Sequence, residues 1–143
     1  MIRKYKAEDT EEILDIWHEA SKTAHPFLNS EFIKHEKENI REIYLPKAET
    51  WVYEENKSML GFISMLGNEV AGIFVKPEKH RKGIGRKLLN YVSKFNKELE
   101  VEVFKANKMA ILFYENYGFK VTKELVHQET GHKLLRMKCL KKT

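Results

Sequence analysis

A cluster of basic residues around two glycines is the part of the sequence best suited to chemistry. Residues 75–92, VKPEKHRKGIGRKLLNYV, hold six basic residues and one acidic residue around Gly83-Ile84-Gly85. The apolar run VAGIFV precedes them and a helical pattern follows, so the cluster fills a strand-to-helix turn. A helix start presents unpaired N–H groups and a positive dipole, and glycines let a phosphate reach that backbone. We call residues 76–87 of this segment the basic loop. The basic loop is predicted to bind a di- or polyphosphate.

Other interpretations of the basic loop remain open at this point. It lacks the Gly-x-x-x-x-Gly-Lys-Ser/Thr pattern of a nucleoside triphosphatase and the Gly-x-Gly-x-x-Gly spacing of a dinucleotide fold. The net charge of the chain, +5, equals the charge of this loop, because the remaining residues balance at 20 basic and 20 acidic. A nucleic-acid-binding protein more often spreads its excess charge over a face or a tail. We therefore expect no nucleic-acid partner, although an RNA-binding module and a solvated lysine-rich turn are the alternatives.

The elements that position this loop follow from periodicity. Apolar residues at helical spacing predict helices over residues 7–20 and 30–45, with Asp9 and Glu12 as a capping box and Ser30 as an N-cap. Short apolar runs separated by turns predict a three-stranded antiparallel meander over residues 50–75. Further elements are expected as a first strand at 1–6, a helix after the basic loop with Phe95 on its apolar face, a strand at 99–104, a helix at 107–119 and a C-terminal hairpin.

The order of these elements predicts the fold class. A strand–helix–strand crossing over residues 70–104 implies a parallel pair, because such a crossover needs a helix's length of chain. The prediction is an α/β fold with a mixed central sheet and helices on both faces, in one domain spanning residues 1–143. The single cysteine, Cys139, and the lack of a long apolar run or an apolar leader favour a cytoplasmic protein that does not cross a membrane.

Taken together, these motifs resemble the GNAT superfamily of acetyl-CoA-dependent N-acetyltransferases, and the resemblance covers essentially the whole chain. The family's loop reads Gln/Arg-x-x-Gly-x-Gly/Ala, and here the segment is His80-Arg81-Lys82-Gly83-Ile84-Gly85, so its first position departs from the pattern. The second motif matches closely, as Asn107…Ala110…Phe113-Tyr114…Gly118-Phe119. The resemblance implies a GNAT fold with a splayed parallel pair, and is nearest to small bacterial-type enzymes that acetylate protein N-termini or lysine.

The resemblance also implies roles for individual residues. Backbone groups at Phe74 and Val75 would pair with the pantetheine arm of acetyl-CoA, and the Val75 N–H would stabilise the oxyanion of a tetrahedral intermediate. Asn107 would bond the pantetheine, Phe113 would line the cofactor groove, and Tyr114 would protonate the departing thiolate. The pyrophosphate would be held by the amides of Arg81, Lys82, Gly83, Ile84, Gly85 and Arg86.

The amine acceptor also needs a group that removes its proton, since an alkyl ammonium with a pKa of about 10.4 is charged at neutral pH. The strand LEVEVF resembles segments of protein N-terminal alanine acetyltransferases, and strand alternation puts Glu100, Glu102 and Phe104 on one face. Glu102 is the first candidate for the base, ahead of Glu69 and His25. His25 and Phe27, in the irregular segment AHPF, are expected to border the acceptor.

The remaining expectations concern partners and alternatives. No metal is expected, because His127 and His132 flank a turn without helical or cysteine-pair spacing and are expected to be solvated. The chain is expected to act alone or as a homodimer on acetyl-CoA and a primary amine, from a peptide, a protein or a small molecule. The alternative is a non-catalytic domain of the same fold that binds or senses acyl-CoA.

Overall fold

The strands and helices follow the predicted order. The computed structural model describes residues 1–79 and 82–140. Its strands are β1 (Ile2–Lys4), β2 (Glu49–Glu55), β3 (Ser58–Leu66), β4 (Glu69–Val75), β5 (Glu98–Phe104), β6 (Lys120–Val126) and β7 (Lys133–Leu140). Its helical segments are η1 (Ala7–Asp9), α1 (Thr10–Ala24), α2 (Ser30–Asn39), η2 (Ile40–Tyr44), α3 (Leu45–Lys47), η3 (Pro77–Lys79), α4 (Ile84–Ser93) and α5 (Lys108–Tyr117).

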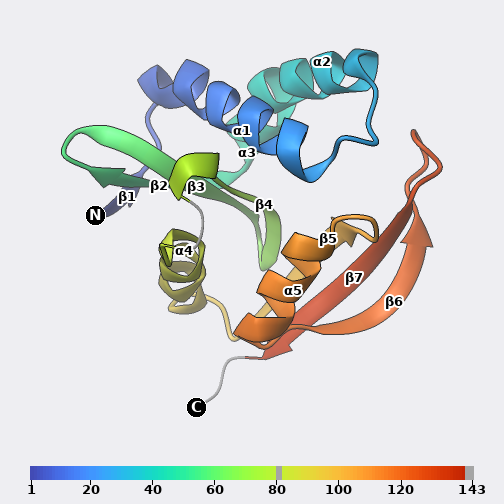
Figure 1. Ribbon diagram of the computed structural model, residues 1–143. Coiled ribbons are helices and arrows are strands. Elements are labelled where there is room, and N and C mark those ends of the chain that lie inside the picture. Colours follow the sequence, from blue (N-terminus) through green and yellow to red (C-terminus); the bar gives the residue numbers. More distant parts are fainter. Residues whose placement is uncertain (80–81, 141–143) are drawn as a thin grey trace.

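All seven strands form one mixed sheet, in the order β1-β2-β3-β4-β5-β7-β6 (Figure 1). The pair β4–β5 is parallel and every other neighbouring pair is antiparallel. The predicted meander and the predicted parallel crossover through α4 are therefore confirmed. The mixed α/β class is confirmed with them.

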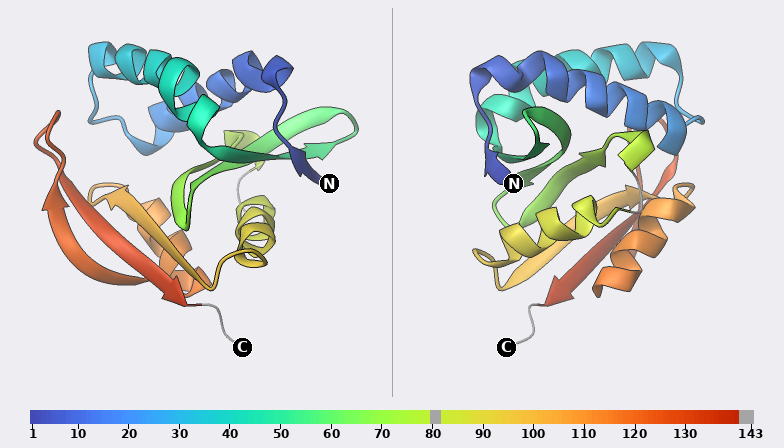
Figure 2. Two further views of the ribbon diagram at one scale, coloured as in Figure 1. Left: turned by 180° about the vertical axis from the view of Figure 1, so that it is seen from behind. Right: turned by 60° about the vertical axis from the view of Figure 1, so that its left-hand side comes forward.

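Helices cover both faces of the sheet (Figure 2). On one face, Ile13, Ile16 and Trp17 of α1 pack against Val52 and Phe62 of the meander. On the other face, a larger core joins the buried side of α4 to Tyr114 of α5 and to Phe119. The helices α1 and α2 thus lie opposite α4 and α5.

The parallel pair separates soon after it begins. Its ladder contains only Glu69 with Glu100 and Val70 with Val101. Beyond these residues β4 continues to Val75, still paired with β3, and β5 continues to Phe104, still paired with β7. The sheet therefore divides into two halves that diverge between β4 and β5 (Figure 1).

Three local predictions are wrong. Asp9 does not form a capping box with Glu12, because its carboxylate accepts hydrogen bonds from the Arg3 guanidinium at 2.8 and 2.9 Å and from the Lys6 N–H at 2.8 Å. The bonds from Arg3 also hold the pKa of Asp9 below its usual value. Asn29, not Ser30, caps α2, and its side-chain oxygen accepts from the Phe32 N–H at 2.7 Å.

The third wrong prediction is that Phe95 lies on the apolar face of α4. That helix ends at Ser93, and the Phe95 side chain is 64% exposed and lies against Trp51 and Tyr91. Among the described residues, no helix is long and apolar enough to cross a membrane.

Candidate functional site

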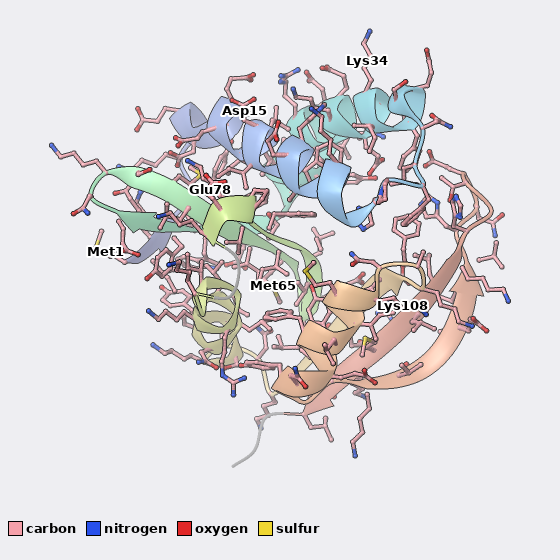
Figure 3. The ribbon with its side chains drawn as sticks, viewed as in Figure 1. Met1, Asp15, Lys34, Met65, Glu78 and Lys108 are labelled. Atoms are coloured by element: carbon pink, nitrogen blue, oxygen red, sulfur yellow. The ribbon has the colours of Figure 1, made fainter. Side chains whose placement is uncertain are left out.

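A cavity of about 420 Å³ lies where the two halves of the sheet diverge. We call it the cleft cavity. The helical pair α1–α2 and the segment η2 line one side, and β3 and β4 form a wall beside them. The ends of β5 and α5 line the other side, and Lys108 marks the first residue of α5 in Figure 3. A volume of this size lies within the range of small-molecule sites in proteins.

Tyr114 brings a phenol to the cleft cavity from α5. Its side chain is 5% exposed, and its ring packs edge-on against Phe113 and Phe119. Its hydroxyl makes no hydrogen bond to any described residue. Burial raises the pKa of Tyr114 well above its usual value, because the apolar surroundings disfavour the phenolate. The hydroxyl therefore keeps its proton and can donate a hydrogen bond to a group in the cavity.

Asn107 is the N-cap of α5 and also reaches across the cavity. Its side-chain oxygen accepts from the Ala110 N–H at 3.1 Å. Because the oxygen is used in this cap, the side-chain nitrogen of Asn107 faces Nε2 of His25, 3.1 Å away, and donates to it. Asn107 can therefore cap α5 with its side-chain oxygen and contact a ligand with its side-chain nitrogen.

His25 is held as a neutral ring. Burial lowers its pKa to about 4, because charge is disfavoured away from water. Since Nε2 accepts from Asn107, the single ring proton sits on Nδ1. This hydrogen bond occupies the lone pair that a base would use, so the geometry favours the carboxylates over His25 for that role.

Carboxylates enter the same cavity from β4 and β5. The register shifts between Ser64 and Met65, so Ala71 is an extra residue in β4 and Glu69 shares a sheet face with Gly72. On β5, Glu102 and Phe104 share that face, as predicted. The cavity is lined by Glu69, Glu102 and Phe104 together with Tyr114 and Asn107. The sequence placed Glu102 on the correct face but could not show the bulge that places Glu69 beside it.

Arg136 of β7 neutralises this cluster in part. Its guanidinium donates to Glu102 at 2.9 Å, to Glu100 at 3.3 Å and to Glu69 at 3.5 Å. Its side chain is only 20% exposed. Three carboxylates thus share one cation, and the cluster keeps a net negative charge that favours a cationic amine nearby.

The basic loop lies at the start of α4, as predicted. Gly83 is the N-cap in the left-handed region, with φ of 79°, and the exposed side chains of Lys82 and Arg86 flank it. A Cβ on Gly85 would lie 3.0 Å from the ring of Phe113, so this glycine keeps a close approach between α4 and α5. Ile84 is buried, so only its backbone can meet a ligand. Arg81 and His80 lie outside the described residues.

These features fit a nucleotide tail with an extended arm. Bare amides at the start of α4 and flanking cations suit phosphates. The diverging backbone of β4, ending at Phe74 and Val75, suits an extended chain, and Phe74 lines the cavity. Among residues 1–79 and 82–140, no group of His, Cys, Asp and Glu is arranged to hold a metal ion.

A cluster of aromatic and histidine rings lies beside the cavity, and the sequence did not reveal it. Phe27 does not line the cavity, and instead its ring contacts His25, Phe104 and His132. The expectation that His127 and His132 are solvated is wrong, because His127 packs against Phe104 and lines the cavity. The cluster connects the α1–α2 loop to the β6–β7 turn, and Figure 2 shows these two segments near each other. Two histidine-containing turns in the sequence were its only signal.

Comparisons with known proteins find relatives over most of the chain. The family model described as "Acetyltransferase (GNAT) domain" matches residues 6–141. The peptidyl-lysine N-acetyltransferase YiaC of Escherichia coli K12 is 36% identical over 122 residues, which cover 85% of this chain and 84% of that protein. The peptidyl-lysine N-acetyltransferase YjaB of the same organism is 33% identical, over 85% and 82% of the two chains.

Solved structures show the same fold. The solution structure of apo YjaB from Escherichia coli superposes with a TM-score of 0.86 at 30% identity, covering 96% of this chain and 95% of that one. The PaiA N-acetyltransferase of Thermoplasma acidophilum, crystallised with coenzyme A, superposes with a TM-score of 0.83 at 23% identity, over 99% and 98% of the chains.

Proposed function

Because the chain belongs to the GNAT family of acetyltransferases, which use acetyl-CoA, we propose that it acetylates lysine side chains of peptides or proteins by direct attack of the amine. Two relatives, at 36% and 33% identity over most of the chain, carry the name peptidyl-lysine N-acetyltransferase, and this supports the acceptor class. The negative carboxylate cluster, of which Glu69 and Glu102 line the cleft cavity, supports a cationic acceptor independently.

The cofactor site is assigned to residues on both sides of the split in the sheet. The amides from Lys82 to Arg86 hold the pyrophosphate, with Arg81 assigned to the same loop. The backbone of Phe74 and Val75 holds the pantetheine arm, and Phe113 lines the groove beside Gly85. Asn107 donates its side-chain N–H to the arm. Acetyl-CoA supplies an acetyl group activated as a thioester.

Two protein groups handle the protons. Glu102 accepts the proton of the incoming ammonium, directly or through a water, which leaves a neutral amine as the nucleophile. Tyr114 donates its proton to the departing thiolate, and burial of the phenol keeps that proton in place beforehand. Glu69, which lines the same cavity, is the second candidate for the base.

One observation supports the proposal: the groups to which we assign proton donation, pantetheine binding and proton removal all line one cavity, at the point where β4 and β5 separate. Tyr114 and Asn107 come from α5, while Glu69 and Glu102 come from the two diverging strands. Direct transfer needs donor, acceptor and proton-transfer groups within one volume.

The test is an acetyl-transfer assay with peptides that contain one lysine and a blocked N-terminus. Release of free thiol and acetyl-lysine in equal amounts is expected, and none with the same peptide carrying arginine in place of lysine. Glu102→Gln should lower kcat by about 10²-fold or more. Glu100→Gln is the matched control, because Glu100 binds the same guanidinium but does not line the cavity. CoA binding without acetylation of any lysine peptide would contradict the proposal.

A further inference from the structure

One hydrogen bond connects the two sides of the cleft cavity. His25 is the C-cap of α1, and Asn107 is the N-cap of α5, 82 positions later in the chain. Their side chains meet at 3.1 Å, Nδ2 of Asn107 to Nε2 of His25. The bond therefore joins the helix that borders the acceptor side to the residue assigned above to the pantetheine arm.

The remaining contacts of Asn107 fix the direction of its amide. Its oxygen accepts from the Ala110 N–H at 3.1 Å, so the amide cannot turn over without breaking the cap of α5. Of the two N–H groups on Nδ2, one is directed to His25. The other has no acceptor among the described residues, and Asn107 lines the cleft cavity.

The ring of His25 is itself held in place. It packs edge-on against two aromatic rings. The centroid of the His25 ring lies 5.6 Å from that of Phe27 and 5.2 Å from that of Phe104. The backbone N–H of His25 donates to the Ser21 carbonyl at 2.8 Å, which fixes the chain at the end of α1. Burial lowers the pKa of His25 to about 4, so the ring is neutral at pH 7 and Nε2 can accept.

We propose that His25 is a positioning residue for the acetyl-CoA site, which orients the Asn107 amide so that its second N–H meets the pantetheine arm. The inference rests on the proposed role of Asn107. It gives His25 a function in cofactor binding rather than in proton abstraction. It also means that the acceptor-side loop and the cofactor site share one hydrogen-bonded contact.

The first test uses His25→Phe, which keeps a ring between Phe27 and Phe104 and removes the acceptor. We expect Kd for CoA and KM for acetyl-CoA to rise about 3- to 10-fold, as for loss of one orienting hydrogen bond, with kcat nearly unchanged. The matched control is His132→Phe, because His132 packs in the same ring cluster without contacting Asn107. Its Kd for CoA should stay within twofold of the wild type.

A double-mutant cycle separates this role from a purely structural one. Asn107→Asp keeps the oxygen that caps α5 and removes the donor. In that background, His25→Phe should weaken CoA binding no further, because the two residues act through one bond. Additive losses, or a His25→Phe protein that binds CoA as the wild type does, would overturn the inference while leaving the proposed function in place. A wild type that binds no CoA would overturn both.

A measurement on the unaltered protein covers the case in which the variants fold poorly. Nitrogen-15 spectra of the histidine rings report which nitrogen carries the proton. Neutral His25 with the proton on Nδ1 is expected, and the Nε2 resonance should shift when CoA is added. A proton on Nε2 would overturn the inference.

Discussion

The guanidinium of Arg136 and the carboxylate of Glu102 face each other across β5 and β7 as direct ladder partners, 2.9 Å apart. The same guanidinium also reaches Glu100 and Glu69. Arg136 thus binds carboxylates from both strands of the parallel pair. It holds Glu69 and Glu102 beside the cleft cavity, where the acceptor amine is expected.

Removal of that cation should weaken turnover of the lysine peptide. In Arg136→Gln, Glu69 and Glu102 lose the guanidinium that binds both of them beside the cavity. We expect kcat/KM for the lysine peptide to fall about 10-fold, as for loss of a hydrogen bond to a charged group. Lys138→Gln is the control, because Lys138 pairs with Glu98 on the same two strands, away from the cavity. An unchanged kcat/KM in Arg136→Gln would argue that these carboxylates do not act in catalysis.

Tyr114→Phe should separate chemistry from binding. The ring keeps its packing against Phe113 and Phe119, while the proton donor is lost. We expect kcat to fall about 10²-fold or more, with Kd for CoA unchanged within about threefold. Because burial raises the pKa of Tyr114, the wild-type rate should not fall through phenol ionisation between pH 7 and 9. Isothermal titration and steady-state rates measure the two quantities, and equal kcat values would remove Tyr114 from the mechanism.

Two glycines in the left-handed region allow a matched test of the basic loop. Gly83 has φ of 79° at the start of α4, and Gly67 has φ of 63° in the β3–β4 turn, and an added Cβ at either would meet none of the described residues within 4 Å. Alanine at either position should cost about 1 kcal/mol of folding free energy through backbone strain. Gly83→Ala should in addition weaken CoA binding, whereas Gly67→Ala should not. Equal CoA affinities for the two variants would count against a phosphate site at Gly83.

The buried His25 ring should make stability depend on pH. Its pKa is about 4 when folded and 6.5 as an ordinary value, so the unfolded chain binds the proton first as the pH falls. The contribution is present above pH 6.5, decreases as the pH falls towards 4, and amounts to about 3 kcal/mol at most. Urea unfolding of wild type and His25→Phe across this range measures it as the difference between the two curves. A difference that does not change with pH would show that His25 is not buried as a neutral ring.

Local patterns in the sequence were sufficient for most of the fold. Period-two and helical spacing located the meander, the α4 crossover and α5, because each depends on residues close in the chain. The predicted capping box failed at Asp9 because the Arg3 guanidinium binds its carboxylate, a contact outside the helix that helical spacing does not reveal. The exposed Phe95 shows the same limit, since the helical spacing continued past the point where α4 ends.

Motifs in the sequence selected part of the candidate site. Tyr114, Asn107 and Glu102 line one cavity, and their roles there stay predictions. The bulge at Ala71, the shared guanidinium of Arg136 and the contact between His25 and Asn107 depend on register and on residues far apart in the chain. Spacing alone carries no signal for such long-range relationships.

The most direct test of the account is a crystal structure of the protein with coenzyme A bound. We expect the phosphates of coenzyme A to bind the backbone amides at the start of α4 and its pantetheine arm to lie alongside β4. Its sulfur should lie within hydrogen-bond reach of the Tyr114 hydroxyl. Coenzyme A bound elsewhere, or a sulfur far from Tyr114 with the gap between β4 and β5 closed by side chains, would contradict it.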